Sequence, residues 1–237
     1  MAISHESNQV DRKAWSIDRV KPFWVLIILG FIILGYIAYP KIYPEPMDTI
    51  PTTGETVTDI DGNVYRTIKI GDQTWMMENL KTTRLNDGQE IPYVTVDREW
   101  ETRTSPGYCW PNNDPSNKDD YGAMYNWHTV DTGKLAPEGW HVPTYEEWET
   151  LAEYLEGDSV AGGALKEMNF SIRWAGDRIY TGEFVYFNEF EKYWCSTGGG
   201  WHPTDAQYWT ITRQETVFSA SSHPRMDGHS VRCIKDN

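Results

Sequence analysis

Apolar residues predict a short amphipathic helix in the segment that follows Thr144. Four of them recur at the i, i+3, i+4 and i+7 positions of one helical face: Trp148, Leu151, Ala152 and Leu155. Thr144 and Glu147 are spaced as a capping box, in which each side chain hydrogen-bonds the backbone N–H of the other residue. Gly157 is the expected stop, because glycine readily adopts the left-handed conformation that ends a helix. We therefore expect a helix between Thr144 and Gly157, with Trp148 buried.

The histidine just before this helix has two interpretations. His141 together with Glu146 or Glu147 resembles an acid–base pair, which is one arrangement that catalytic sites use. Carboxylates in a first helical turn are also stabilised by the positive end of the helix dipole, so they need no substrate to account for them. We favour the structural interpretation, in which His141 contributes to stability.

Apolar residues and turn signals predict a β-meander at residues 57–80. An Asp-Gly turn and a Gly-Asp turn divide this segment into three predicted strands. Val64, Ile68 and Ile70 are expected on one face of the middle strand. The amino-terminal part of the domain is therefore expected to be an antiparallel sheet.

The rest of the chain predicts few, short elements. Residues 122–130 include a short helix signal, whereas residues 193–201, 206–213 and 229–236 read as strands separated by turn-rich segments. Helices and strands in such a balance favour the α+β class for residues 57–237.

An uncharged apolar run at residues 23–39 predicts a membrane anchor. Its seventeen residues would span about 25 Å as a helix, at the short end of the range for a membrane span. The aromatic residues near its two ends match the preference of such rings for the membrane interface: Phe23, Trp24, Tyr36 and Tyr39. Gly30 and Gly35 allow close approach of another helix. A cleaved signal peptide is the alternative, but the run has no clean small-x-small cleavage site.

Basic residues predict the orientation of this anchor. Segment 1–22 carries four Lys or Arg residues, whereas only Lys41 follows the apolar run closely. We therefore expect a cytoplasmic tail at 1–22 and a single-pass helix in the inner membrane. Residues 40–56 contain four prolines and are expected to form an extended linker. The domain at 57–237 is then expected in the periplasm.

Charge and composition limit the partners of this domain. Residues 57–237 carry 16 Lys or Arg against 29 Asp or Glu, a net charge of 16 − 29 = −13, which argues against nucleic acid. Ten of the twelve tryptophans lie in the same segment, so aromatic rings are expected to fill much of the core.

Two loops contain candidate contacts for a protein partner or a glycan. Trp110 and Trp201 lie among Gly, Pro and Asn residues, so both rings are candidates to project from loops and stack on a sugar or a protein partner, with core filling, the more frequent fate of tryptophan, as the alternative. Asn112, Asn113 and Asp114 add polar side chains beside the first ring. The Asn and Asp residues of this loop match no EF-hand spacing, so a hydrated turn is favoured over a metal site.

Five ordered motifs carry a family resemblance, and they read VTDIDGNVYRTIKIGDQTWMMENLKT, YGAMYNWHTV, PEGWHVPTYEEWETL, GGALKE and SVRCIKD. Together they resemble the Fibrobacter succinogenes major paralogous domain family over nearly all of residues 57–237. The resemblance implies a C-type-lectin-like or sulfatase-modifying-factor-like α+β domain with irregular loops, similar to formylglycine-generating enzymes. It brings no assigned activity. Ala136 stands where a cysteine often precedes the Pro-x-Gly-Trp-His motif of the family.

The three cysteines do not support the oxidase chemistry of the formylglycine-generating relatives. Those enzymes hold copper between two cysteines close in sequence, whereas no two cysteines here lie within thirty residues of each other. Cys195 and Cys233 lie on predicted strands and form a candidate disulfide, and packing as small buried hydrophobes is the alternative. The odd count leaves at least one cysteine unpaired or in an intermolecular bond.

These observations lead to one expected function and two alternatives. The chain has no His-Glu-x-x-His, Gly-x-Ser-x-Gly or Cys-x-x-Cys motif, so we expect a protein without catalytic activity, cofactor or metal. We expect a membrane-anchored accessory subunit whose periplasmic domain binds and stabilises a larger membrane protein complex, with photosynthetic, respiratory and secretion assemblies as candidates. A membrane-tethered, lectin-like glycan-binding module is the main alternative, and an enzyme of unknown reaction is the other.

Overall fold

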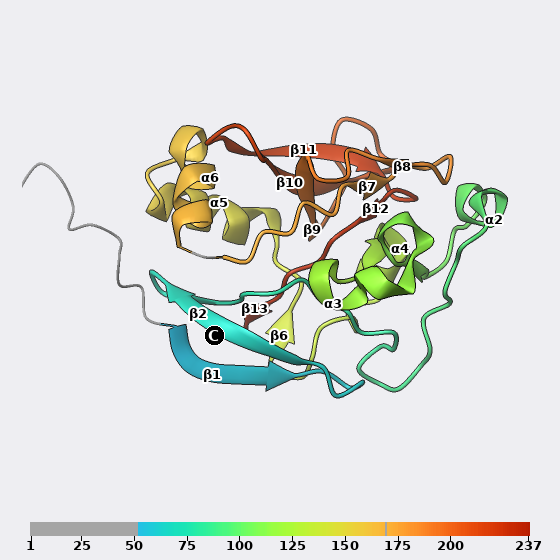
Figure 1. The fold of residues 1–237 in the computed structure, drawn as a ribbon, viewed down its shortest axis with the longest axis horizontal. Coiled ribbons are helices and arrows are strands. Elements are labelled where there is room, and N and C mark those ends of the chain that lie inside the picture. The colour runs from blue at the N-terminus through green and yellow to red at the C-terminus, as the bar shows by residue number, and fades with distance from the viewer. Residues whose placement is uncertain (1–51, 169) are drawn as a thin grey trace, which may run out of the picture. The chain divides into compact units, whose positions relative to one another are not determined.

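A computed structural model describes residues 52–168 and 170–237 of this chain, and the structural statements that follow concern those residues (Figure 1). The expected cytoplasmic tail, the expected membrane helix at 23–39 and most of the expected linker lie outside them. Among the described residues, no helix combines the length and the apolar character that a bilayer crossing requires.

The first sheet contains the expected meander together with the end of the chain. Its strand order is β1 (Thr52–Thr58), β2 (Val64–Ile70), β3 (Gln73–Met76), β13 (Ile234–Lys235) and β6 (Trp140–His141). The predicted three-stranded meander is confirmed, because β2 pairs antiparallel with both β1 and β3. Strand β13 lies between β3 and β6, so residues near the carboxyl terminus connect the meander to the segment that precedes the capped helix.

Two further sheets form the rest of the β structure in residues 52–168 and 170–237. One has the order β4 (Tyr108–Cys109), β5 (Met124–Asn126), β12 (Gly228–His229), β7 (Asp177–Arg178) and β8 (Phe184–Val185). The other has the order β11 (Phe218–Pro224), β10 (Asp205–Thr212) and β9 (Phe190–Gly198). The predicted late strands are confirmed in β9, β10, β12 and β13. Strand β11 was not predicted, because its serines and histidine give little apolar signal.

The helices are few and mostly a single turn. They are α2 (Asp97–Glu101), α3 (Lys118–Tyr121), α4 (Trp127–Val130), α5 (Tyr145–Tyr154) and α6 (Asp158–Glu167), with 3₁₀ turns η2 (Pro111–Asn113) and η3 (Pro115–Asn117). Only α5 and α6 reach ten residues within the described part of the chain. Figure 1 shows these two helices side by side at one end of the molecule.

The expected fold class is wrong. The described residues form a β-rich domain of three antiparallel sheets, not a balanced α+β domain of C-type-lectin-like or sulfatase-modifying-factor-like type. Several strands are only two residues long and pair with segments far away in the chain, as β12 pairs with β5 and β7. Two-residue strands such as β4, β7 and β8 have no periodicity of their own, so the local pattern did not predict them.

The capped helix is confirmed as predicted. Thr144 Oγ1 accepts a hydrogen bond from the Glu147 N–H at 3.2 Å, and Glu147 Oε2 accepts one from the Thr144 N–H at 2.8 Å. The apolar face of α5 is buried at Trp148, Leu151 and Ala152. The helix ends at Tyr154, shortly before Gly157, whose φ is +97°.

The expected face of β2 is partly wrong, because the strand contacts two core clusters. Val64 is 58% exposed, whereas Ile68 and Ile70 are buried. Tyr65 packs in one cluster, and Ile68 and Ile70 pack in the other. Consecutive strand residues point to opposite faces, so Tyr65 and Thr67 lie on one face of β2, and Ile68 and Ile70 lie on the other. The first half of the strand therefore buries one face and the second half buries the opposite face.

Aromatic rings fill the core, as the tryptophan content predicted. Seven tryptophans of the described segments are buried: Trp75, Trp100, Trp110, Trp127, Trp148, Trp194 and Trp209. The rings of Trp75 and Trp148 lie 4.4 Å apart between centroids, and Trp148 stacks on Tyr193 at 5.3 Å. The amphipathic helix α5 is thus held to β3 and β9 by ring contacts, each of which contributes beyond the burial of its area.

Candidate functional site

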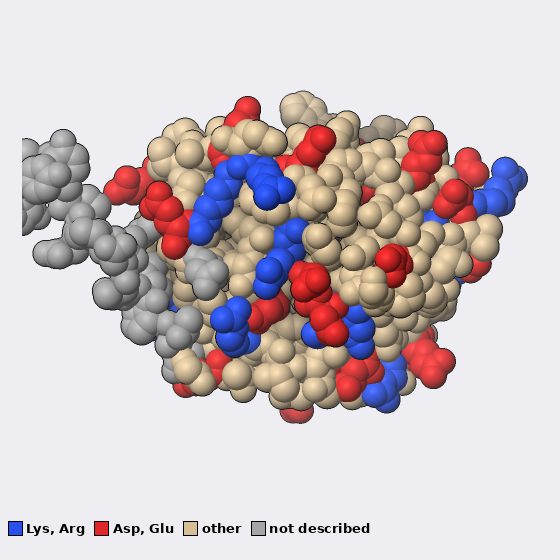
Figure 2. Space-filling model, viewed as in Figure 1, with Lys and Arg blue, Asp and Glu red and all other residues tan. Residues whose placement is uncertain are grey.

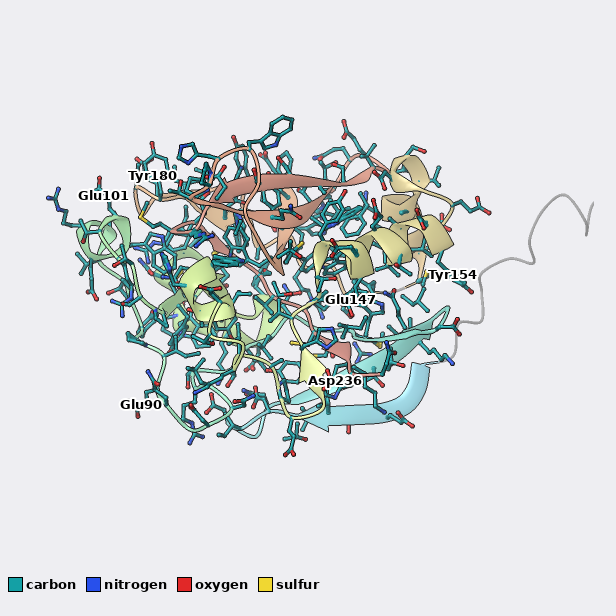
Figure 3. All side chains as sticks on the ribbon, turned by 180° about the vertical axis from the view of Figure 1, so that it is seen from behind. Glu90, Glu101, Glu147, Tyr154, Tyr180 and Asp236 are labelled. Atoms are coloured by element: carbon teal, nitrogen blue, oxygen red, sulfur yellow. The ribbon has the colours of Figure 1, made fainter. Side chains whose placement is uncertain are left out.

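His141 lies between two carboxylates. Its Nε2 is 2.8 Å from Glu147 Oε1, and its Nδ1 is 2.6 Å from Asp236 Oδ1. Figure 3 labels the two carboxylates, one on α5 and one just after β13. The hydrogen bond to Glu147 raises the pKa of His141 to about 9, with Asp236 adding to the effect and partial burial opposing it. The imidazole is therefore positively charged at neutral pH.

This geometry favours the structural interpretation of His141. A doubly protonated imidazole with both nitrogens bonded has no lone pair with which to accept a proton from a substrate. Glu147 is engaged as well, because its second oxygen caps the amino terminus of α5. The three side chains connect β6, α5 and the segment after β13, which lie apart in the sequence.

Trp110 does not project from its loop. Its side chain is 6% exposed and packs edge-on against Tyr108, with centroids 5.2 Å apart. The apolar ring is therefore part of the core, because its burial contributes more than an exposed position would.

The polar residues after Trp110 mainly stabilise turns. Asp114 Oδ1 accepts hydrogen bonds from the Ser116 N–H at 2.9 Å and from its hydroxyl at 2.8 Å, which caps η3. Asn113 Nδ2 donates to Thr95 O at 2.9 Å. Asn112 and Asn113 both have a φ of 55°, in the left-handed region that asparagine tolerates. These contacts favour the turn interpretation over the contact-site interpretation.

Trp201 does project, and it borders a groove. Its side chain is 90% exposed at the turn between β9 and β10. The Trp201 groove is a shallow depression of about 310 Å³ lined by Tyr145, Gly200, Trp201, Gln207, Ala220, Ser221 and Ser222. The Trp201 N–H donates to Ser222 Oγ at 3.0 Å, so the backbone beneath the ring is tied to β11. Gln207 Oε1 is buried and has no hydrogen-bond partner within the described chain.

A second cluster was missed by the sequence reasoning. His223 near the end of β11, Asp227 in the following turn and His229 in β12 converge beside Tyr208. His223 Nδ1 lies 2.9 Å from Asp227 Oδ2, and His223 Nε2 lies 3.1 Å from the Tyr208 hydroxyl. The only sequence signal was the His-x-x-x-Asp-x-His spacing, and this spacing has no meaning until a turn brings the three residues together.

Next to this cluster lies a buried ion pair. Lys192 Nζ contacts Asp177 Oδ2, and both side chains are almost entirely shielded from solvent. Burial raises the pKa of Asp177, and the opposing effect of Lys192 only partly offsets it. His223 and Asp227 also act on this carboxyl electrostatically, so the ion pair and the histidine cluster form one charged group.

Arg232, from the last family motif, is the centre of another buried network. Its Nη2 donates to Asn79 Oδ1 at 2.6 Å, and its Nη1 donates to Phe170 O. Asn79 Nδ2 in turn donates to the buried Glu191 Oε1 at 2.7 Å. The guanidinium carbon lies 4.3 Å from the ring centroid of Phe170. These contacts offset much of the unfavourable burial of the charge, although the buried Nε of Arg232 has no hydrogen-bond partner among the described residues.

The disulfide considered between Cys195 and Cys233 is absent. All three cysteines are within the described chain, and all three are free and buried. Cys195 and Cys233 belong to different core clusters. Burial raises the pKa of the Cys109 thiol to about 12 and raises the pKa of the other two thiols as well. The cysteines therefore pack as small hydrophobes, which was the alternative interpretation.

Comparison with known proteins establishes the family. Residues 68–235 match the family described as the Fibrobacter succinogenes major domain, which is more than half of the chain. The chain belongs to this family, and the resemblance carried by its five motifs is confirmed. Comparisons with curated proteins and with solved structures find no match.

Proposed function

We propose that this chain is a membrane-anchored, non-catalytic accessory subunit whose domain binds a larger membrane protein assembly through the Trp201 groove. The observation that carries the proposal is the exposure of Trp201. At 90%, it exceeds that of every other large hydrophobic side chain in residues 52–168 and 170–237. Tryptophan is enriched among the few residues that supply most of the binding energy in protein interfaces.

The groove has the features of a prepared contact surface. The hydrogen bond from the Trp201 N–H to Ser222 Oγ holds the backbone, while the ring stays free to bury its area in a partner. Tyr145, the first residue of α5, adds a second aromatic wall. A side chain that is already positioned loses less conformational entropy on binding, which favours affinity.

The surface charge is consistent with a localised contact. On the face drawn in Figure 2, acidic and basic side chains are interspersed, and neither sign covers the whole face. Docking directed by one large charged patch is therefore not the interaction that this face favours. An aromatic anchor with a polar rim fits better.

The predicted anchor at 23–39 would add a second contact with the same assembly. Two linked contacts reinforce each other, because the first raises the effective concentration of the second. A weak Trp201 contact in the periplasm would then be sufficient when the membrane helix packs against the same complex.

Glycan binding is the second candidate, and Gln207 favours it. Its buried Oε1 is an acceptor without a partner in the described chain, beside the groove-lining serines Ser221 and Ser222. A sugar would stack on Trp201, and its hydroxyl would reach the buried Gln207 Oε1 once the side chains that cover this atom move aside. Protein binding remains the primary proposal, because the membrane anchor predicted from the sequence holds the domain beside membrane assemblies.

Mild-detergent extraction of the full chain followed by native mass measurement tests the proposal. Wild type should co-purify with a larger membrane assembly, and Trp201→Ala should lose it. Tyr180→Ala is the matched control, since Tyr180 is an exposed aromatic on the β7–β8 turn and does not line the groove (Figure 3). A monomer under every gentle extraction, together with specific retention of the wild type on a glycan array, would replace the accessory-subunit proposal with glycan binding.

A further inference from the structure

His223, Asp227 and His229 offer one ligand atom each, and these atoms all lie within 4.8 Å of one another. They come from the end of β11, the turn after it and β12, so the fold holds them together over seven positions of sequence. Imidazole nitrogen and carboxylate oxygen are ligands that zinc and related transition metals prefer.

His229 presents an unprotonated nitrogen to this space. The ring is fully buried, and its Nδ1 lies 3.0 Å from Gly228 O, to which it donates. The Nε2 atom is then an acceptor, and it has no partner in the described part of the chain. Trp194 packs on the ring at 4.1 Å between centroids and fixes its plane. A neutral imidazole with a free lone pair is the form that binds a metal.

Asp227 contributes a second unsatisfied atom. It is 2% exposed, its Oδ2 faces His223 Nδ1 at 2.9 Å, and its Oδ1 has no hydrogen-bond partner among the described residues. Leaving a buried acceptor unpaired is unfavourable. Two orphaned acceptors, one on Asp227 and one on His229, therefore lie in the same cluster, and a cation would satisfy both.

The ring nitrogens of His223 and His229 that face away from the cluster make the contacts that are usual for metal-bound histidines. Such histidines usually bond their second ring nitrogen to a carbonyl, carboxylate or other polar group, which fixes the ring. His229 does this through Nδ1 and Gly228 O, and His223 does it through Nε2 and the Tyr208 hydroxyl. The remaining nitrogen of each ring is thereby left for the shared space.

The local charge also favours a cation. Asp177 and Asp227 supply two carboxylates, whereas Lys192 supplies one ammonium that pairs with Asp177. With both histidines neutral, the group carries one net negative charge. A cation is therefore attracted to this buried region, where charges are little screened, and a divalent ion would change the net charge of the group from −1 to +1.

We propose that His223 Nδ1, the Asp227 carboxylate and His229 Nε2 bind a divalent transition-metal ion, with zinc the best fit to this ligand set. Ligand atoms of a tetrahedral zinc site lie about 3.3 Å apart. The His223–Asp227 separation of 2.9 Å is close to that value, and the ligand atoms, which all lie within 4.8 Å of one another, would reach it with a shift of at most about 1.5 Å. The shift would fall mainly on His223, which is partly exposed at the sheet edge, and its contact with the Tyr208 hydroxyl would adjust with it.

Binding would connect β11 to β12 across the turn between them. Because β12 pairs with both β5 and β7, the ion would stabilise the attachment of one sheet to another. A ligand that binds only the folded state raises the melting temperature, and the stabilisation grows with the logarithm of its concentration relative to Kd. The site is thus expected to be structural.

The test uses the full chain in mild detergent, without a polyhistidine tag and after treatment with a chelator. Titration with zinc sulfate, followed by calorimetry and thermal melting, should show one ion per chain and a melting temperature raised by several degrees. Magnesium at the same concentration should have no effect, since it prefers oxygen ligands. X-ray absorption of the zinc-loaded wild type should report only nitrogen and oxygen neighbours.

Asp227→Asn keeps the shape of the side chain and removes its charge, so it should weaken zinc binding at least tenfold. His202→Gln is the matched control, because this exposed histidine bonds Thr204 outside the cluster, and its zinc affinity should equal that of wild type. No binding by wild type with a Kd below about 10 μM would overturn the proposal. Equal binding by wild type and Asp227→Asn, or sulfur neighbours in the absorption spectrum, would do the same.

Discussion

His141 Nε2 lies 2.8 Å from Glu147 Oε1, and the same carboxylate accepts the backbone N–H of Thr144 through its other oxygen. One glutamate therefore serves both the cap of α5 and the histidine on β6. Asp236 bonds the other ring nitrogen at 2.6 Å, so the end of the chain joins the same group. The stability of this junction depends on the charge of His141.

The pH dependence of stability should reflect this pairing. The pKa of His141 rises from 6.5 to about 9 on folding, so its contribution is complete below pH 6.5 and is lost as the pH rises through about 9. The pKa of Glu147 is lowered, since the effects of His141 and Thr144 exceed the effect of burial. Its contribution is present above its unfolded pKa and is lost in acid. Melting temperatures measured from pH 4 to 10 should fall at both ends.

His141→Gln separates the loss of stability at alkaline pH, which depends on His141, from the loss at acidic pH, which depends on Glu147. The variant should be less stable than wild type at pH 6, and the difference should shrink towards pH 10, because wild type loses the charged interaction there. His202→Gln, at an exposed histidine, should follow the wild-type curve. A constant difference between His141→Gln and wild type across this range would show that the charge of His141 has no role.

Removal of the helix cap should lower the stability of the protein moderately. Thr144→Ala deletes the hydroxyl that accepts the Glu147 N–H and should lower the free energy of unfolding by about 1 kcal/mol. Thr150→Ala, at an exposed position inside α5, should cost much less. Urea unfolding at pH 7 measures both, and equal losses for the two variants would contradict the role of the cap.

Replacement of Arg232 should strongly lower the stability of the folded protein. Arg232→Met removes the positive charge beside the buried Glu191 and Asn79, and breaking such a group costs about 3–5 kcal/mol. Arg213→Met at an exposed site should stay close to wild type. Thermal melting distinguishes them, and a small effect of Arg232→Met would mean that methionine packing compensates for the lost network.

The thiols should be inert in the native protein. Burial raises the pKa values of Cys109, Cys195 and Cys233, so little thiolate is available to react. A maleimide reagent should label no cysteine in native protein and all three after denaturation without reductant. Labelling of only one cysteine after denaturation would reveal a disulfide between the other two.

The topology predicted from charge asymmetry is independent of the described structure. Protease added to spheroplasts should digest the domain at 57–237 and spare a tag on segment 1–22. Loss of the tag with retention of the domain would reverse the predicted orientation. The same cells, lysed before protease treatment, provide the control that both parts are accessible to cleavage.

Local interactions let the sequence alone determine α5 and the first meander. The capping box joins Thr144 and Glu147 within one turn, and the strands of residues 57–80 are joined by short turns. Such contacts involve neighbours in the chain, so spacing and residue type were enough to predict them. The family motifs were equally readable, and they led to the correct family.

Tertiary structure decided the features that depend on distant partners. Trp110 and Trp201 have similar loop surroundings in the sequence, but Trp110 packs against Tyr108 and Trp201 does not enter the core. Two-residue strands such as β7 were not predicted, because β7 exists as a strand only through its pairing with β12 and β8. The cluster of His223, Asp227 and His229 likewise requires the turn between β11 and β12. Whether a segment is buried on both sides depends on distant parts of the fold, so it cannot be predicted from the local sequence pattern.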